Sequence, residues 1–365
     1  MSNIYEISSA AGNYKIEVGS QLVEKVVEQH SDAIYIIDQK LVGSLPSSIT
    51  KRLVIEAIEE NKALENTAQY IVQLRQLGAN RETHLVVIGG GIIQDIVTFV
   101  ASIYMRGLRW TYLPTTVLSM VDSCIGGKSS INVLGLKNLV GNFYPPQDIF
   151  IDPKFISTLD ADMIVGGLFE SAKICYAKSP QCFNEYLALN PSAHVSPQDM
   201  PAIIGLALTT KKWFIEIDEF DQAERLLLNF GHTFGHAIEA ATNFKVHHGI
   251  GVGVGMLAAC EFSASRYPLN AEGSAAVATL RNHVTQMLLT NSGDPLVSPG
   301  MIDLDKTLEQ FEHDKKHRTS AYRVVVPVED GCLQLVSLTR DAATQSEIRQ
   351  AYRAAFSRIN WSYNS

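Results

Sequence analysis

The chain has 365 residues, of which 46% are hydrophobic and 19% charged, so it is long enough for two domains with a large core. Its formal net charge of -8 provides no basic excess to neutralise phosphates, so we expect no nucleic-acid partner. We find no signal peptide, no apolar run of the ~18 residues that a membrane span needs, and only five scattered cysteines, which together predict a cytoplasmic protein without a membrane partner.

Strand-like and helix-like segments alternate in the first part of the chain. The expected strands are residues 14–18, 33–37, 53–58, 85–88, 110–113 and 149–151, and the expected helices are residues 63–77 and 92–104. Alternation of this kind predicts a parallel sheet with flanking helices. We therefore expect an α/β nucleotide-binding domain over residues 1–153, ending at a proline-rich hinge.

Three glycines, residues 89–91, follow the strand at residues 85–88 and precede a helix. This order lets a backbone approach a pyrophosphate at a helix N-terminus. The letters GGGIIQD do not form the GxGxxG fingerprint, so a tight turn remains an alternative. Asp38, at the end of an early strand, suits either a ribose hydroxyl or a turn.

Polar side chains interrupt apolar and glycine-rich sequence between residues 106 and 138. They are Arg106, Asp122, Lys128, Lys137 and Asn138. Cations in such a loop suit an anionic, phosphorylated ligand, although a solvated loop surface is the alternative. Residues 126–129 read GGKS but form no Walker A loop, because position 122 is not glycine.

Helical patterns dominate the second part of the chain, which we expect to form a helical domain over residues 154–365. The expected helices are residues 161–189, 200–220, 225–242, 251–266, 272–290 and 304–313, and residues 322–326 form the one expected strand. The helix expected at residues 161–189 carries Glu170 and Lys173 within an apolar stretch.

The segment of residues 225–248 carries polar groups on an otherwise apolar helical pattern. His232 and His236 are four residues apart and share a helical face, which Arg225 and Asn229 are expected to join. Burying these groups without partners would cost several kcal/mol, so a polar ligand or a metal is expected. The letters HTFGH lack the glutamate of a HExxH zinc protease, and the spacing does not say which histidines bind a metal.

Several of these segments together resemble the 3-dehydroquinate synthase family of sugar phosphate cyclases, over residues 38–325. The resemblance is carried by GGGIIQD, YLPTTVLSMVDSCIGGKSSIN, LKNLVGNFYPP, GGLFESAK, LNFGHTFGHAIEA and the late DKK. It implies a Zn²⁺ ion, or Co²⁺ or another divalent metal, held by Glu170, His232 and His248.

The resemblance also implies the residues that bind the substrate and NAD. Its substrate set is Arg106, Asp122, Lys128, Lys137, Asn138, Lys173, Lys211, Arg225, Asn229, His236 and one of Lys315 and Lys316. Its NAD set is Asp38, Glu59, Lys62, Gly90, Gly91, Asp95, Thr115 and Thr116. In this family Arg106 reaches the phosphate from the neighbouring subunit of a homodimer.

The implied reaction converts 3-deoxy-arabino-heptulosonate 7-phosphate, a seven-carbon sugar acid, to 3-dehydroquinate with release of phosphate. The chain departs from the family pattern, for instance at Gly249-Ile250, where Gly-Glu is usual. Sister cyclases of the amino-dehydroquinate, valiolone or deoxy-inosose type, and an iron-type NAD-dependent alcohol dehydrogenase, are the alternatives. Arg225 and Asn229 are present, which favours a substrate with a carboxylate.

Overall fold

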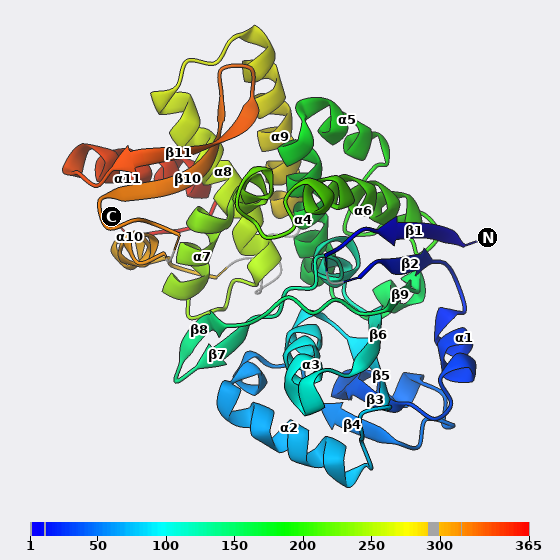
Figure 1. Cartoon of the computed structure of the whole chain (residues 1–365). Helices are drawn as coiled ribbons and strands as arrows, with labels where there is room; N and C mark the ends of the chain where they lie inside the picture. Colours follow the sequence, from blue (N-terminus) through cyan, green and yellow to red (C-terminus); the bar gives the residue numbers. More distant parts are fainter. Residues whose placement is uncertain (1, 11, 291–298, 315, 365) are drawn as a thin grey trace. The chain divides into compact units, whose positions relative to one another are not determined.

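The computed structural model describes residues 2–10, 12–290, 299–314 and 316–364. The chain forms two compact units, one of residues 1–159 with 196–219 and the other of residues 160–195 with 220–365 (Figure 1). The sequence analysis expected a single boundary after residue 153. Residues 196–219 instead belong to the first unit, because helix α6 (Met200–Ile217) packs on the π-helical turn η4 (Ser119–Ser123) and on the N-terminal strand.

The first unit is built on a seven-stranded sheet in the order β1-β2-β9-β6-β5-β3-β4. The strands are β1 (Asn3–Ile7), β2 (Tyr14–Val18), β3 (Ile34–Asp38), β4 (Arg52–Ile55), β5 (His84–Gly89), β6 (Arg109–Pro114) and β9 (Asp148–Ile151). Only the edge pair β1–β2 is antiparallel, so the predicted parallel sheet is confirmed. The apolar run at residues 85–88 is fully buried, as expected for a central strand covered on both faces.

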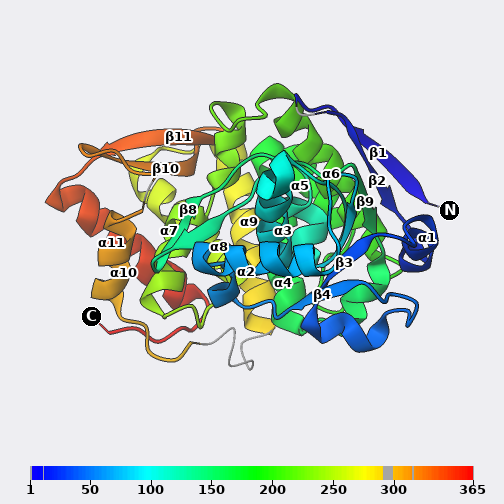
Figure 2. The same cartoon turned by 60° about the horizontal axis from the view of Figure 1, so that its bottom comes forward.

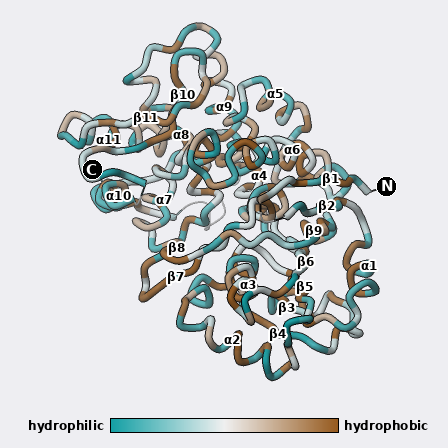
Figure 3. Tube along the Cα trace, viewed as in Figure 1, coloured by the Kyte–Doolittle hydropathy of each residue, from teal (hydrophilic) through white to brown (hydrophobic). Residues whose placement is uncertain are grey.

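The first unit also contains the helices α1 (Leu22–Gln29), α2 (Leu64–Gln76) and α3 (Gly91–Ile103). Helix α3 packs on β3, β5 and β6, and α2 lies beside it (Figure 2). A hairpin of β7 (Ile131–Val133) and β8 (Leu136–Val140), which the sequence analysis did not expect, packs on both helices through β7. Figure 3 shows the hydrophobic colour along β7, and Leu134 at the hairpin turn is 86% exposed.

The second unit is mainly helical, as predicted. Its helices are α4 (Ala161–Lys178), α5 (Pro180–Ala188), α7 (His232–Ala241), α8 (His248–Arg266), α9 (Ala271–Thr290), α10 (Leu304–Glu312) and α11 (Ala342–Arg358). It is not purely helical, because β10 (Ala321–Val328) and β11 (Cys332–Thr339) pair as an antiparallel hairpin. The helix expected over residues 161–189 is two helices, since Pro180 cannot continue α4 and Ser179 caps α5 through the Cys182 amide at 3.1 Å.

Helix α8 approaches α4 and α7 closely because glycines line its contacts. A Cβ atom at Gly249 would overlap the backbone of Gly166 on α4, and one at Gly255 would overlap the carbonyl of Gly231 before α7. A larger residue at either contact would force the helix backbones apart. This packing holds the starts of α7 and α8 near the middle of α4.

The expected helix over residues 225–242 is broken, which corrects one prediction. Residues 224–229 form the 3-10 helix η6 (Glu224–Asn229), Gly231 has a φ of 75°, and α7 begins at His232. A Cβ at Gly231 would lie 2.7 Å from the carbonyl oxygen of Val252, so the chain turns here against α8. Arg225 and Asn229 therefore do not share a helical face with His232.

Within the described ranges, no helix combines the length and the apolar composition that crossing a membrane would require.

Candidate active site

Three side chains from α4, α7 and α8 converge in the second unit. The Glu170 Oε1 atom lies 3.8 Å from the Nε2 atom of His232 and 3.4 Å from the Nε2 atom of His248. Ligands that bind zinc tetrahedrally at about 2.0–2.2 Å are separated from one another by about 3.3–3.6 Å. The two separations from Glu170 Oε1 are close to these values, so the cluster suits a divalent metal ion.

In both His232 and His248, the Nδ1 atom lies beside a hydrogen-bond acceptor. The Nδ1 atom of His232 lies 3.3 Å from the Phe230 carbonyl oxygen, and the Nδ1 atom of His248 lies 3.0 Å from Glu239 Oε1. When Nδ1 donates, Nε2 keeps the lone pair that a metal needs. Both rings thus present Nε2 toward Glu170.

The carboxylate of Glu170 is the most deeply buried member of this cluster. The residue is 1% exposed, and among the described residues neither of its carboxylate oxygens accepts a well-formed hydrogen bond, although Lys173 three residues later makes an ion pair with it. A buried carboxylate without hydrogen bonds is costly unless a cation is near. The donor set of one carboxylate and two imidazoles therefore fits Zn²⁺ or Co²⁺.

His236 is a second neighbour of the two imidazoles. Nitrogen atoms of His232, His236 and His248 all lie within 4.8 Å of one another, so a three-histidine set is geometrically available. The His236 Nδ1 atom, however, lies 3.2 Å from the Lys316 ammonium and 3.5 Å from Asp314 Oδ2. A set of Glu170, His232 and His248 leaves His236 with these two partners, whereas a three-histidine set does not.

The charges around the cluster set the protonation of the imidazoles. Burial, together with the nearby Lys173 ammonium, holds the pKa of His232 well below its usual range. Burial also lowers the pKa of His236, and Lys316 lowers it further. Burial acts in the same direction on His248, but the Glu239 and Glu170 carboxylates outweigh it and raise that pKa to about 10.

Lys316 of the late DKK segment reaches this cluster through His236. Lys315 lies outside the described residues. Arg225 is 3% exposed on η6, which packs on α4. Asn229, at the end of η6, donates from Nδ2 to the Leu226 carbonyl at 3.0 Å, so its Oδ1 atom remains the acceptor.

The first unit gathers a second group of the predicted residues. Lys62, which is buried, lies 2.9 Å from Asp95, 3.6 Å from Glu59 and 3.1 Å from the Asn138 Oδ1 atom, and Lys137 lies 3.8 Å from Glu59. Burial raises the pKa of Asp95 to about 6. Burial opposes charge on Lys62, but Asp95 and Glu59 together raise its pKa. Lys137 and Asn138 of the β7–β8 hairpin, which are expected substrate residues, therefore contact Glu59 and Lys62, which are expected NAD residues.

The glycine loop lies at the carboxyl ends of neighbouring parallel strands, where open α/β sheets bind ligands. Gly90 precedes α3, and a Cβ there would lie 2.8 Å from a methyl group of Thr116. A Cβ on Gly91 would meet only the Ser123 hydroxyl, at 3.7 Å. The Thr115 amide donates to the Gly89 carbonyl at 3.1 Å.

Asp38, another residue of the expected NAD set, ends β3 and caps η1 (Gln39–Ser44) by accepting a hydrogen bond from the Lys40 amide, so it has a turn role.

Four other predicted residues have defined settings in the first unit. Asp122 of η4 and Lys211 of α6 make an ion pair. Lys128 lies over the Phe143 ring at 5.9 Å. Arg106 is exposed, and it occupies the middle of three consecutive residues with positive φ, at 48°, 74° and 129°. Left-handed backbone is unusual for residues other than glycine, so the local structure holds Arg106 in a specific conformation.

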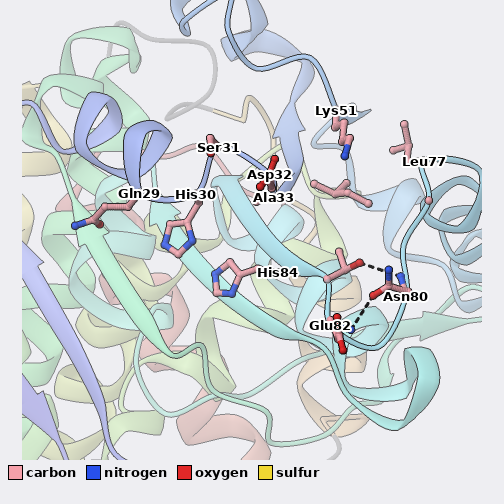
Figure 4. A pocket seen from close by; sticks show the side chains of 13 residues that line it. Gln29, His30, Ser31, Asp32, Ala33, Lys51, Leu77, Asn80, Glu82 and His84 are labelled. Atoms are coloured by element: carbon pink, nitrogen blue, oxygen red, sulfur yellow. Dashed lines mark hydrogen bonds between the residues drawn. The ribbon is translucent and has the colours of Figure 1, made fainter.

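A polar cavity of about 360 Å³ lies elsewhere in the first unit, at the amino ends of β3 and β5. Figure 4 shows the His30 and His84 rings beside each other at its wall, and they stack with centroids 4.4 Å apart. Burial lowers the pKa of His84 to about 4. None of the predicted site residues lines this cavity, and the glycine loop follows the opposite end of β5.

Comparison with known proteins places this geometry in a family. Residues 52–165 match the family model described as 3-dehydroquinate synthase N-terminal, and residues 167–317 match the one described as 3-dehydroquinate synthase C-terminal. The chain belongs to the 3-dehydroquinate synthase family. The 3-dehydroquinate synthase of Clostridium tetani is 35% identical over 275 residues, covering 74% of this chain and 72% of that protein. That of Dictyoglomus thermophilum is 33% identical over 334 residues, covering 88% and 91%.

Solved structures support the fold assigned to this 3-dehydroquinate synthase family member. A 2-deoxy-scyllo-inosose synthase complexed with carbaglucose-6-phosphate, NAD⁺ and Co²⁺ is 24% identical, with a TM-score of 0.82 over 96% of this chain and 99% of that one. A 2-epi-5-epi-valiolone synthase from Streptomyces hygroscopicus, with NAD⁺ and Zn²⁺ bound, is 22% identical, with a TM-score of 0.77 over 97% and 100%. An iron-containing alcohol dehydrogenase shares the fold more distantly, at 14% identity and a TM-score of 0.60 over 98% of this chain and 99% of that one.

Sequence reasoning missed two acidic residues of the cluster. Glu239 contacts His248, and Asp314 contacts His236. Glu239 stands seven residues after His232, and residues seven apart share a helical face, so its position carried a usable signal. Asp314 begins the DKK segment, in which the family resemblance assigned only a lysine to the site.

Proposed function

We propose that this chain is a 3-dehydroquinate synthase that converts 3-deoxy-arabino-heptulosonate 7-phosphate to 3-dehydroquinate and releases phosphate. The observation that carries the proposal is the buried set of Glu170, His232 and His248 in a chain whose family match extends over both units. NAD and a divalent metal are the proposed cofactors, as the names of two solved relatives report for those proteins.

When bound, NAD would supply a hydride acceptor and the metal a Lewis acid, which together acidify the C–H bond next to the oxidised carbon. Glu170, His232 and His248 would hold the metal. The NAD set is proposed to be Asp38, Glu59, Lys62, Gly90, Gly91, Asp95, Thr115 and Thr116. The absence of a side chain at Gly90 and Gly91 and the position of the loop at the carboxyl ends of β5 and β6 support this assignment.

Arg225 and Asn229 would bind the substrate's carboxylate and a hydroxyl. A planar guanidinium grips a carboxylate through two parallel hydrogen bonds, and the Oδ1 atom of Asn229 can accept from a hydroxyl. His236, between Lys316 and Asp314, is placed to hold or move a proton at Nδ1.

The remaining polar residues would bind the phosphate and the other hydroxyls. A dianionic leaving group needs several cations, and the chain offers a set of them with polar companions. The set is Arg106, Asp122, Lys128, Lys137, Asn138, Lys173 and Lys211. We propose that Arg106 acts from a neighbouring subunit, since a homodimer is the assembly that the family resemblance implies.

Release of inorganic phosphate from 3-deoxy-arabino-heptulosonate 7-phosphate, with NAD and Zn²⁺ added, tests the proposal directly. Sedoheptulose 7-phosphate and glucose 6-phosphate serve as matched substrates without a carboxylate. Phosphate release from either of these, with none from the sugar acid, would indicate a sister cyclase. Net NADH formation from simple alcohols without phosphate release would indicate a dehydrogenase.

A further inference from the structure

Glu239 lies near the end of α7 and is 9% exposed. Its Oε1 atom is 3.0 Å from the Nδ1 atom of His248, the first residue of α8. An ionised carboxylate can only accept a hydrogen bond, so Nδ1 must carry the hydrogen. In the neutral form of the ring the Nε2 atom then keeps its lone pair, and it is this atom that faces Glu170 at 3.4 Å.

The two metal-facing imidazoles are held by different acceptors. His232 uses a neutral one, the Phe230 carbonyl at 3.3 Å, whereas His248 uses the charged carboxylate of Glu239. A charged acceptor forms a shorter and stronger hydrogen bond. It also makes the imidazole a more basic ligand, as carboxylate–histidine–metal arrangements do elsewhere.

The packing leaves space for this contact. Gly251 faces Glu239 from α8, and a Cβ on Gly251 would lie 2.9 Å from Glu239 Cγ and 3.1 Å from Oε1. Any side chain at position 251 would therefore displace the carboxylate or push α7 and α8 apart. The hydrogen bond to His248 thus depends on an acidic residue in one helix and on a glycine in the other.

We infer that Glu239 is a positioning residue, which fixes His248 in the tautomer with Nε2 available and strengthens that nitrogen as a metal ligand. The inference rests on the proposed function only in taking Glu170, His232 and His248 as the ligands. Glu239 itself is not a ligand of that site, because its oxygen contacts the ring nitrogen opposite Nε2.

Metal affinity of the full chain tests this role. Zn²⁺ and Co²⁺ dissociation constants are measured by competition with a chelator, for the parent and for Glu239→Gln and Glu239→Ala. We expect Glu239→Ala to weaken binding about 10- to 100-fold, as loss of such partners does. Glu239→Gln keeps an acceptor without the charge, so it should fall between Glu239→Ala and the parent.

Asp162→Asn is a matched control. The Asp162 Oδ2 atom lies 3.5 Å from Nδ1 of His247, so this variant alters a carboxylate–imidazole pair at the residue next to the ligand. It should leave metal affinity unchanged. Gly251→Ala keeps Glu239 but displaces its carboxylate, and it should weaken binding in the same direction as Glu239→Ala.

The visible spectrum of the Co²⁺-loaded protein separates positioning from simple stabilisation. A changed ligand field at His248 should shift the cobalt bands of Glu239→Gln, while a merely structural role would lower only the melting temperature of the metal-free chain. Parent-like affinities and spectra in Glu239→Gln, Glu239→Ala and Gly251→Ala would overturn the inference. A parent protein that binds no metal would instead overturn the proposed function.

Discussion

Arg225 carries a guanidinium that is almost completely buried, in a short 3-10 helix that packs on α4. Arginine is always charged and offers five donors in a planar fork, so burying it is costly unless acceptors surround it. A lysine in the same place would keep the charge but lose the fork. The residue type at this position therefore matters beyond its charge.

We predict that Arg225→Lys keeps the fold and the metal but loses catalytic efficiency toward the sugar acid phosphate. Hydrogen bonds to charged groups contribute roughly 1.5–3 kcal/mol, so kcat/KM should fall about tenfold to a hundredfold. Arg349→Lys, at a surface ion pair with Asp305, is the control and should behave like the parent. Equal activity of Arg225→Lys and the parent would mean that Arg225 does not bind the carboxylate.

Glu170 and His236 are the two candidates for the third metal ligand beside His232 and His248. We predict that His232→Ala and Glu170→Gln each lose the bound metal, whereas His236→Ala retains it and loses turnover. Metal content per chain after dialysis, measured by atomic emission, decides between the two sets. Retention of metal by Glu170→Gln together with its loss in His236→Ala would favour the three-histidine set.

His283 gives the second unit a dependence on pH that is separate from the metal cluster. Its ring packs edge-on against Phe183 and Tyr186 of α5, and its buried Nε2 atom has no hydrogen-bond partner among the described residues. Burial lowers the pKa of His283 from 6.5 to about 4. Between these values the unfolded chain binds a proton that the folded chain does not, so stability falls as the pH falls through this window.

We predict that the unfolding free energy of the parent drops between pH 6.5 and pH 4, and that His283→Phe removes part of this drop. One pKa unit corresponds to about 1.4 kcal/mol, so the share of His283 is at most about 3 kcal/mol and smaller where water reaches the ring. Urea titrations at several pH values measure it. The exposed His194→Gln is the control, and an identical pH profile for His283→Phe and the parent would contradict the prediction.

At the scale of elements, strongly periodic or fully apolar segments could be predicted from the sequence. Strand β2 begins and ends where expected, and the apolar run at residues 85–88 identified the central strand β5. The break at Gly231 could not be predicted, because apolar spacing continues through residues 226–230 and only the contact with α8 ends the helix. Helix α11 was missed because most of its residues are polar or alanine.

The hairpin β7–β8 shows why part of the candidate site was beyond sequence reasoning. Its residues expose apolar side chains and carry Lys137 and Asn138, so they follow neither a buried nor an alternating pattern. Only the folded unit shows that Asn138 meets Lys62, 76 residues earlier in the chain. The proposed metal ligands came from two histidines and the family resemblance, whereas the contact of Glu239 with His248 is seen only in the structure.

The glycine loop between β5 and α3 is the proposed binding site for the pyrophosphate of NAD. We expect Gly91→Val to fold normally, because a Cβ at Gly91 would make only an ordinary van der Waals contact with the Ser123 hydroxyl at 3.7 Å. We expect it to lose NAD affinity, because its side chain would occupy the room for the pyrophosphate. Calorimetric titration with NAD⁺ measures the loss, which should exceed tenfold. Gly43→Ala, which lies in open surroundings, is the control, and undiminished NAD binding by Gly91→Val would remove the glycine loop from the cofactor site.

At the scale of the whole molecule, the two groups of predicted residues are divided between the two units. Glu59, Lys62 and Asp95 belong to the first unit, while Glu170, His232 and His248 belong to the second. A ligand that binds only the folded state stabilises it by about 2.7 kcal/mol at a concentration one hundred times its dissociation constant. Such stabilisation slows amide exchange in the segments whose opening releases the ligand.

We therefore predict that each cofactor protects a different unit. Zn²⁺ alone should slow hydrogen exchange mainly in residues 160–195 and 220–290, and NAD⁺ alone mainly in residues 34–144, by up to about a hundredfold at saturation. Peptide-resolved exchange with mass spectrometry measures both effects. His232→Ala should abolish only the metal effect and Gly91→Val only the NAD effect, so that each variant is the control for the other. Zinc protection centred on residues 34–144 would show that the metal binds at Glu59, Asp95 and their neighbours rather than at the histidine cluster, and the ligand assignment would then be wrong.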